Sequence, residues 1–281
     1  MRRRFGAIRD RFKSWGPPPP TPDGTMSLYD HLRELRYRVV IAVIAVAVTT
    51  LIAAFFYRSL VALVVWPYNV AVVQYKQMNP DARVDLVNSG LVQPFMLALK
   101  TTLVAGLIVA SPVWMYQLWA FIVPALLEKE KRYAIRFVLA AVPLFLSGCA
   151  LGYFILPTGF AFMLGFTVDG VLNLQDLNAF LSLELTLILL FGVSFLLPVV
   201  LVMLNLIGIV TGAQLGAARS YAIFGCFLFG AMATPSADPF SMTALAAPMA
   251  VMYVIAEVIC RRQDRIKAKT KASDEFAVSL D

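Results

Sequence analysis

The chain alternates between long apolar runs and short polar segments. Apolar runs of about 20 residues recur, and this is the length that an α-helix needs to cross the ~30 Å hydrocarbon core of a bilayer. The pattern predicts an all-α, polytopic membrane protein with six transmembrane helices. The expected spans are residues 39–57, 94–121, 133–156, 179–204, 221–234 and 240–259.

The fifth run is too short for an ordinary span. About 14 helical residues cover about 21 Å, so this helix must thin the bilayer locally or lie against protein or water. A tight turn at residues 235–239 connects it to the sixth run. We expect the single helices of partner proteins to pack against this pair.

The residues before the first span are amphipathic. Ser27 and Asp30 fit a capping box in which Asp takes the place of Glu, so a helix is expected to begin here. We expect it to lie along the membrane surface and then to turn into the first span. Its apolar stripe, with steps of four, three and four residues, consists of Leu28, Leu32, Leu35 and Val39.

Composition divides the chain into three parts. Residues 1–25 are basic and proline-rich, so a disordered tail is expected; no apolar region follows the first arginines, which argues against a cleaved signal peptide. Residues 26–260 hold the membrane domain, and residues 261–281 form a charged tail. The loop at 58–93 carries apolar pieces and is expected to fold as a cap outside the membrane.

Composition and charge fit a chain that is surrounded by lipid. Hydrophobic residues make up 60% of the chain and charged residues 15%, against about a quarter charged in soluble domains. The formal charge of +7 therefore concerns membrane orientation and does not indicate nucleic-acid binding. In a six-span topology most of the basic residues share one side with both termini, which the positive-inside rule places in the cytoplasm. The exceptions are Arg58, Lys76, Arg83 and Lys100.

The cysteines and the histidine offer no catalytic or metal site. Cys149, Cys226 and Cys260 have no metal-ligand spacing and are interpreted as small packing residues. His31 is the one histidine of the chain, and no nucleophile motif accompanies it, which disfavours an intramembrane hydrolase. We expect no cofactor, no metal site and no enzymatic activity.

Four ionisable residues lie in or beside the apolar runs. A charge at the centre of a span costs about 2.5–3.5 kcal/mol, so each is a functional candidate. Lys100 can instead snorkel to the interface, Glu257 can be interfacial, and Asp238 can cap the sixth helix. Glu184 lies about 9 Å into its span and should face a partner or a wet cavity. Lys100 and Glu184 leave open an alternative function, a secondary transporter of a small solute, although no internal repeat supports it.

Polar and aromatic residues are densest between the second and third spans, at Ser111–Arg132. Pro124 kinks the chain or starts a new helix there, and Glu128 and Glu130 follow among basic residues. Acidic side chains beside an aromatic and proline shelf predict a docking site for a cationic segment. The aromatic residues, of the kind that gather at a membrane interface, are Trp114, Tyr116, Trp119 and Phe121.

Several motifs occur in an order that is typical of one family. They are HLRELRYRV (31–39), PF (94–95), SPVWMYQLWAFIVPALLEKEKR (111–132), FGVSF (191–195) with Pro198, and TPSADPFS (234–241). Together with six spans, they resemble the TatC family, the C subunit of the twin-arginine protein translocase. The resemblance covers roughly residues 26–260.

The resemblance implies a receptor. TatC-like proteins bind signal peptides that bear a consecutive arginine pair, and they export already folded proteins with the proton motive force. They assemble with single-span TatA- and TatB-like subunits and with other copies of themselves. The resemblance therefore implies a multi-pass protein of the bacterial cytoplasmic (inner) membrane.

The resemblance also implies roles for particular residues. The two signal-binding acids of the family match Glu34 and Glu130, and its other cytoplasmic-site positions match Arg36, Phe121 and Pro124. The remaining candidates are assigned to partner contacts or to structure. They are Pro67, which matches a proline of the first outer loop, Asp238, which matches the acid of the last outer turn, and Lys100, Glu184 and Thr234.

The chemistry of arginine fits two separate acids. A guanidinium binds a carboxylate bidentately, and lysine cannot reproduce that planar fork. Glu34 can alternatively pair with Arg38 at i,i+4 spacing, a contact worth about 0.3–0.5 kcal/mol, and without the resemblance that pair is the favoured interpretation. Glu128 lies two residues from Glu130, on a different helical face, and is not assigned to the site.

The chain departs from the family at three positions. Leu196 stands where an acid usually follows FGVSF, and whether Glu184 replaces that acid is left open. Met242 stands in place of a glutamine, and Val254 in place of an acid, with Glu257 one turn further on. These departures weigh against a polar network inside the membrane like that of the relatives, and they do not affect the cytoplasmic site.

Overall fold

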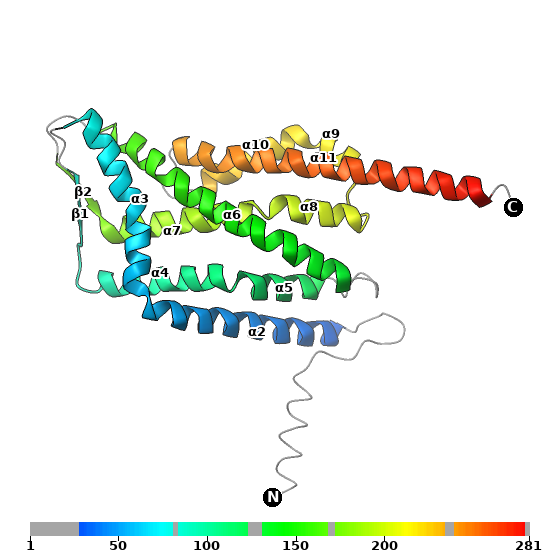
Figure 1. The fold of residues 1–281 in the computed structure, drawn as a ribbon, viewed down its shortest axis with the longest axis horizontal. Coiled ribbons are helices and arrows are strands. Elements are labelled where there is room, and N and C mark those ends of the chain that lie inside the picture. The colour runs from blue at the N-terminus through cyan, green and yellow to red at the C-terminus, as the bar shows by residue number, and fades with distance from the viewer. Residues whose placement is uncertain (1–27, 81–83, 123–130, 168–171, 234–238, 279–281) are drawn as a thin grey trace, which may run out of the picture. The chain divides into compact units, whose positions relative to one another are not determined.

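The protein is seen in a computed structural model that describes residues 28–80, 84–122, 131–167, 172–233 and 239–278 (Figure 1). The described residues are mostly helical, as predicted, with two short strands. The chain forms two compact units. The first comprises residues 1–56 and 102–142, and the second comprises residues 57–101 and 143–281.

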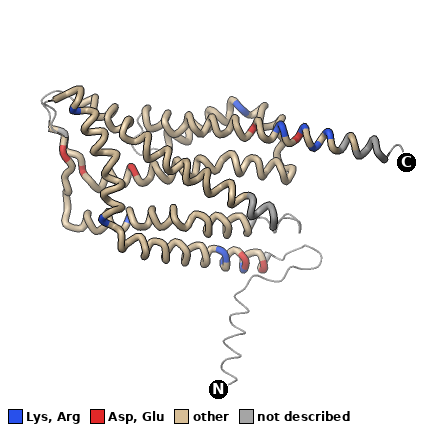
Figure 2. The backbone as a smooth tube through the Cα atoms, in the orientation of Figure 1, with Lys and Arg blue, Asp and Glu red and all other residues tan. Residues whose placement is uncertain are grey.

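The first unit is built on α2, Leu28–Phe55, which packs against α5, Ser111–Ile122 (Figure 1). α2 is one unbroken helix, so the predicted turn from a surface helix into a separate first span is wrong. No Pro or Gly interrupts this stretch, and nothing else ends the helix before Phe55. The charged residues of α2 lie in its first turns (Figure 2).

The second predicted span is a bent pair of helices. α4, Gln93–Val109, meets α5 at an angle of 60°. Pro112 causes the bend, because it has no N–H and its ring clashes with the carbonyl one turn earlier. The Trp114 indole N–H donates to the Leu107 carbonyl at 3.0 Å, which satisfies one backbone acceptor at the bend.

The second unit begins with α3, Tyr57–Met78, followed by β1, Val84–Val87. β1 pairs in parallel with β2, Asn173–Asp176. The segment predicted as a loop is therefore largely helical. The reason is a helical apolar face that the sequence reading missed, whose buried members are Val64, Pro67, Tyr68, Ala71 and Tyr75.

Six further helices complete the described chain. They are α6, Lys131–Leu164; α7, Leu177–Ser194; α8, Leu197–Leu206; α9, Gly212–Ala217; α10, Arg219–Ala233; and α11, Pro239–Val278. In the second unit α10 packs along α11, and α11 also packs against α8 and α9 (Figure 1). A buried cluster formed by α7, α10 and α11 holds Phe191, Cys226, Leu245 and Met249.

Four of the described helical segments are long and apolar enough to cross a membrane, and the bent pair makes a fifth. α10 is apolar but short, as its sequence predicted. These helices make the chain a multi-pass membrane protein. The four long segments are Tyr29–Phe55, Phe137–Leu164, Leu177–Leu206 and Pro239–Thr270.

α11 continues well beyond the predicted sixth span. It contains 40 residues, and the segment predicted as a charged tail is helical as far as Val278. No Pro or Gly interrupts residues 261–278, which are rich in good helix formers such as Lys, Arg and Ala. Figure 2 shows its charged residues gathered in this second half.

Candidate functional site

Glu34, the first of the predicted signal-binding acids, lies on α2 and is only 2% exposed. The Arg38 guanidinium donates to its Oε1 from Nε at 2.9 Å and from Nη2 at 2.5 Å. Both residues belong to one helix face, because positions four apart on a helix are neighbours. The i,i+4 pair that was the alternative role for Glu34 is therefore formed.

The second carboxylate oxygen of Glu34 is not used by this pair. Oε2 is buried and has no hydrogen-bond partner among the described residues. Arg38 Nη1 also reaches Gln117 Oε1 on α5, at 3.5 Å. The acid is thus linked through Arg38 to the neighbouring helix of the same unit, and one of its acceptor atoms remains open.

An aromatic ring of α5 stacks on α2 one turn before this acid, and a second pair of rings connects α5 with α6. Phe121, near the end of α5, stacks on His31, which is one turn before Glu34, with a centroid separation of 4.5 Å and an interplanar angle of 24°. Trp119 stacks on Phe137 at 4.1 Å. Phe121, one of the predicted aromatic residues, therefore lies beside the helical turn that precedes Glu34, and the role of His31 is to pack against it.

Arg36 is the other predicted member of the cytoplasmic site that the structure describes on α2. It is exposed, and no ion pair joins it to another described residue. It lies two positions after Glu34, so it points to another side of α2. Glu130 and Pro124 lie outside the described residues.

Of the predicted membrane residues, the structure describes Lys100, Glu184 and Pro67. Lys100 on α4 is exposed and donates to Ser182 Oγ on α7 at 2.8 Å. Glu184 on α7 is fully buried, and neither of its oxygens has a hydrogen-bond partner among the described residues. Lys100 and Glu184 make no ion pair with each other. Pro67 is buried within α3, while Thr234 and Asp238 lie outside the described residues.

Known proteins place the chain in a family. A family model described as Sec-independent protein translocase protein (TatC) matches residues 30–248. TatC of Frankia casuarinae is 38% identical over 259 residues, which are 91% of this chain and 71% of that protein. TatC of Escherichia coli is 35% identical over 234 residues, 83% of this chain and 87% of that one. This chain belongs to the TatC family.

Solved structures agree with this membership. A crystal structure of the twin arginine translocase receptor TatC superposes with a TM-score of 0.68 at 33% identity, covering 82% of this chain and 98% of that one. A second TatC crystal structure, in the detergent DDM, gives a TM-score of 0.70 at 32% identity. TatC is a membrane subunit of a protein translocase and not an enzyme, so the chain takes part in twin-arginine protein transport.

One buried acid of this TatC chain was missed as a site residue by the sequence reading. Glu257 on α11 is fully buried, although it was considered interfacial. It accepts from Arg219 on α10, at 2.9 Å on Oε2 and 2.8 Å on Oε1, and from Arg261 Nε at 2.8 Å. The i,i+4 spacing of Glu257 and Arg261 was the available signal, whereas the contact with Arg219 depends on the packing of two helices.

A second polar contact holds the same end of α11. Asp264 accepts from the Asn205 side chain at 2.8 Å and from the Gly212 backbone N–H at 2.6 Å. A Cβ added at Gly212, at the start of α9, would lie 2.6 Å from the Arg261 backbone nitrogen, so the small residue permits a close approach of α9 to α11. Ion pairs and hydrogen bonds between residues that are distant in the sequence thus hold α9 and the start of α10 against α11.

Proposed function

We propose that this chain is the signal-peptide receptor subunit of a twin-arginine translocase. Glu34 and Glu130 would each take one guanidinium of the consecutive arginine pair, at the cytoplasmic face of a bacterial inner membrane. The chain would cross the membrane six times with both termini in the cytoplasm. Single-span TatA- and TatB-like subunits and further copies of the chain would complete the translocase.

The observation that carries this proposal is the state of Glu34. Its carboxylate is buried and already binds one guanidinium, that of Arg38, through two donors. A charge-assisted, forked bond of this kind is the geometry that an arginine of a signal peptide would use. The family membership supplies the class of ligand, and Glu34 supplies an acceptor of the right chemistry.

Oε2 of Glu34 can accept a hydrogen bond from an incoming arginine, because it has no partner among the described residues. A carboxylate has room for about four hydrogen bonds, and Arg38 uses Oε1 alone. A signal arginine can bind Oε2 while Arg38 stays in place, or it can displace Arg38 toward Gln117, which already accepts from Nη1. Phe121 and His31 next to the acid would shield these bonds from water, which strengthens them.

The decisive experiment measures export of a twin-arginine reporter from cells that carry single substitutions. We expect Glu34→Ala and Glu130→Ala each to abolish export while the protein still inserts in the membrane. Glu128→Ala is the matched control, because it removes the same charge two residues away and should export normally. Full export by Glu130→Ala would count heavily against the site.

A binding measurement isolates the arginine pair itself. Purified chain should retain an Arg-Arg signal peptide in a pull-down and retain a Lys-Lys peptide far more weakly, because lysine has no planar fork. The net charge of the two peptides is identical, so diffuse attraction is matched. Equal retention of both would remove the bidentate argument.

A further inference from the structure

A cavity of about 330 Å³ opens at one end of the second unit and is distinct from Glu34 and its neighbours. The first turns of α3, α4 and α7 form its walls, with the segment after β1. All of its lining residues belong to the second unit. Its size falls within the range of small-molecule sites, roughly 300–1,000 Å³.

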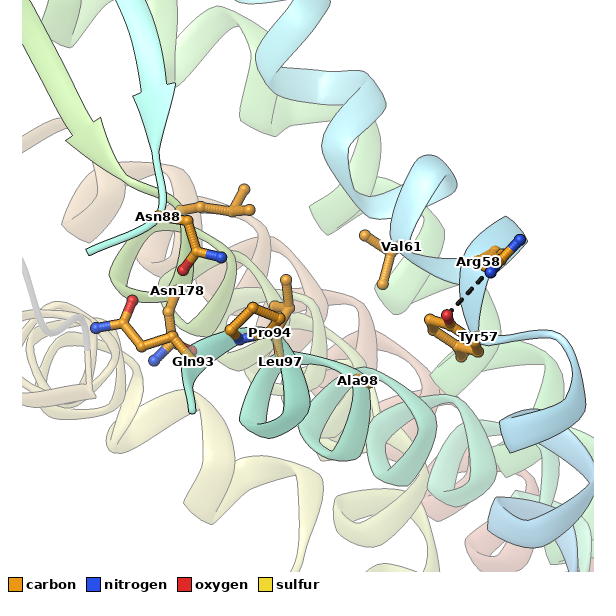
Figure 3. A pocket seen from close by; sticks show the side chains of 10 residues that line it. Tyr57, Arg58, Val61, Asn88, Gln93, Pro94, Leu97, Ala98 and Asn178 are labelled. Carbon is orange, nitrogen blue, oxygen red and sulfur yellow. Dashed lines mark hydrogen bonds between the residues drawn. The ribbon is translucent and has the colours of Figure 1, made fainter. Parts of the chain in front are cut away.

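The cavity has an apolar middle and polar groups on two sides. Val61 and Leu97 contribute apolar surface. In Figure 3, Asn88, Gln93 and Asn178 gather on one side, while Tyr57 and Arg58 lie on the other. A ligand that fits must therefore be polar at both ends of this short distance and must tolerate apolar surface between them.

Two acceptors on the carboxamide side are unsatisfied. Gln93 Oε1 and Asn178 Oδ1 are buried and have no hydrogen-bond partner among the described residues. A buried acceptor without a donor is costly, so each oxygen favours a ligand that carries O–H or N–H groups. The last torsion of Asn and Gln side chains is soft, which lets either oxygen turn toward a donor in the cavity.

The opposite side carries a positive charge. Arg58 Nε donates to the Tyr57 hydroxyl at 3.2 Å, and the guanidinium has no acidic partner among the described residues. Asp176, the acid next to the lining of α7, accepts from Ser89 and from the Ala179 N–H and does not line the cavity. The charge at this side therefore favours an anion, and phosphate is the anion whose geometry suits arginine.

The position of the cavity indicates which class of ligand can reach it. α4 and α7 both begin at its edge, and each starts a candidate membrane span, α4 as the first half of the bent pair. The cavity thus lies where apolar helices start, and we expect this level to be that of the lipid head groups. Large apolar side chains are exposed beside it on α4, namely Phe95 and Leu99. Acyl chains can lie against such a surface while a head group enters the cavity.

We propose that this cavity binds the head group of an anionic glycerophospholipid that carries head-group hydroxyls, with the phosphodiester on Arg58 and the hydroxyls on Gln93 and Asn178. Phosphatidylglycerol has this chemistry. A zwitterionic choline lipid has the phosphodiester but no hydroxyl or N–H donor. Phosphatidic acid has the charge but lacks the head-group hydroxyls.

The test measures lipid binding to the full-length, delipidated chain by native mass spectrometry. Dioleoyl lipids with phosphatidylglycerol, phosphatidic acid and phosphatidylcholine heads are added in turn. We expect phosphatidylglycerol to bind most tightly, about fivefold above phosphatidic acid, the contribution of one net hydrogen bond. Equal binding of all three lipids would overturn the proposal.

Variants locate the binding. Arg58→Gln should weaken phosphatidylglycerol about tenfold, since it removes a charge-assisted bond, and Arg58→Lys should restore most of the affinity. The double variant Gln93→Leu with Asn178→Leu should bind phosphatidylglycerol no better than phosphatidic acid, while phosphatidic acid binding stays unchanged.

A matched control separates the cavity from general attraction. Lys76→Gln removes one exposed positive charge at the far end of α3 and should leave phosphatidylglycerol binding as in the unaltered chain. If Arg58→Gln and Lys76→Gln behave alike, lipid is held by diffuse charge and the site is refuted.

A photo-crosslinker at Ala98 tests whether the cavity binds a peptide instead. Capture of exported polypeptide at Ala98, together with unchanged lipid binding in the variants, would refute the lipid site.

Discussion

At Glu34 one carboxylate would serve two guanidinium groups in turn. Arg38 holds Oε1 in the unliganded chain, and a signal arginine would compete for the same acid. An internal arginine of this kind keeps a buried carboxylate paired while no ligand is present, since an unpaired buried charge is strongly destabilising. Where the signal arginine displaces Arg38, signal binding exchanges one ion pair for another.

This exchange predicts a particular behaviour of Arg38→Gln. The variant should unfold at a lower temperature than the unaltered chain, because Glu34 loses its partner. An Arg-Arg signal peptide should restore more stability to the variant than to the unaltered chain, since its guanidinium replaces the missing one. Thermal unfolding in detergent, with and without peptide, measures both effects.

The Lys-Lys peptide is the control for that experiment and should give a smaller shift in both proteins. The same peptide-induced shift in Arg38→Gln and in the unaltered chain would show that the signal does not meet Glu34 where Arg38 does.

Asp176 offers a second prediction at the scale of one residue. It caps α7 by accepting from the Ala179 N–H at 2.8 Å, and it also accepts from the Ser89 hydroxyl. These bonds, led by that from Ser89, lower the pKa of Asp176 below its usual 3.8. Since the folded pKa is the lower one, the cap stabilises fully above the unfolded value and is lost as pH falls through the folded value.

We therefore expect the first turn of α7 to loosen below about pH 4. Hydrogen-exchange protection of the Ala179 amide, followed between about pH 6 and pH 3, should show this step in the unaltered chain and not in Asp176→Asn. Asp85→Asn, which changes an exposed acid in β1, should leave the step in place. A step that survives in Asp176→Asn would exclude the cap as its cause.

Between elements, α2 and α4 approach closely at one point of the first unit. Thr49 Oγ donates to the Gly106 carbonyl at 2.8 Å, and a Cβ built at Gly106 would lie 2.7 Å from the Thr50 backbone nitrogen. Small residues let membrane helices approach in this way. The contact depends on the absence of a side chain at one position.

Gly106→Leu should therefore separate α2 from α4. We expect a loss of about 1–3 kcal/mol, the usual cost of overpacking, and a lower midpoint of thermal unfolding in detergent. Gly225→Leu is the control, since a Cβ at Gly225 meets nothing within 4 Å. Helix propensity alone would favour leucine at both positions, so equal losses in the two variants would show that the contact with α2 does not set the cost.

The contact of α9 and α10 with α11 gives another prediction at this scale. Arg261→Gln removes a donor to the buried Glu257, whereas Arg262→Gln removes the same charge from an exposed position on the same helix. We expect the first variant to lose about 2 kcal/mol of stability, the order of a hydrogen bond to a charged group, and the second to lose almost none. The reverse order would rule out the assigned role of Glu257.

The helices show which parts of the fold can be predicted from a single sequence. The apolar runs located the apolar part of each long helix, because burial in lipid leaves a strong one-dimensional signal, but they did not predict that α11 continues to Val278. α3 was expected as a loop, since Pro67 and scattered polar residues hide a helical face that becomes apparent only when its buried side is known. A turn before the first span was predicted where α2 is in fact continuous. The change from an amphipathic to an apolar pattern does not by itself show whether the helix bends.

At the scale of the whole molecule, the candidate site was predicted from the sequence only in part. The motifs around Glu34 and the aromatic shelf were found from the sequence, and the stacking of Phe121 on His31 brings two of them together. The contact of Arg219 with Glu257 was not predicted, because residues 38 positions apart meet only through packing. Glu130 lies outside the described residues, so a site in which Glu34 and Glu130 each bind one arginine stays a prediction.

The orientation of the chain is a prediction for the whole molecule. With six spans, a green fluorescent protein fused after Asp281 should fluoresce, and an alkaline phosphatase inserted between Asn88 and Val92 should be active outside the cytoplasm. The basic residues on the side of the termini are the physical reason. An active phosphatase at both positions would contradict an even number of spans.

The length of α11 has a mechanical consequence. Its 40 residues extend about 60 Å, roughly twice the thickness of the hydrocarbon core, as one helix with Pro248 in its first half. A small tilt at the membrane-embedded end therefore becomes a displacement of many ångströms at Val278. A spin label near that end would therefore report small tilts of α11 as large changes in distance. The same tilts would be too small to detect among the packed helices.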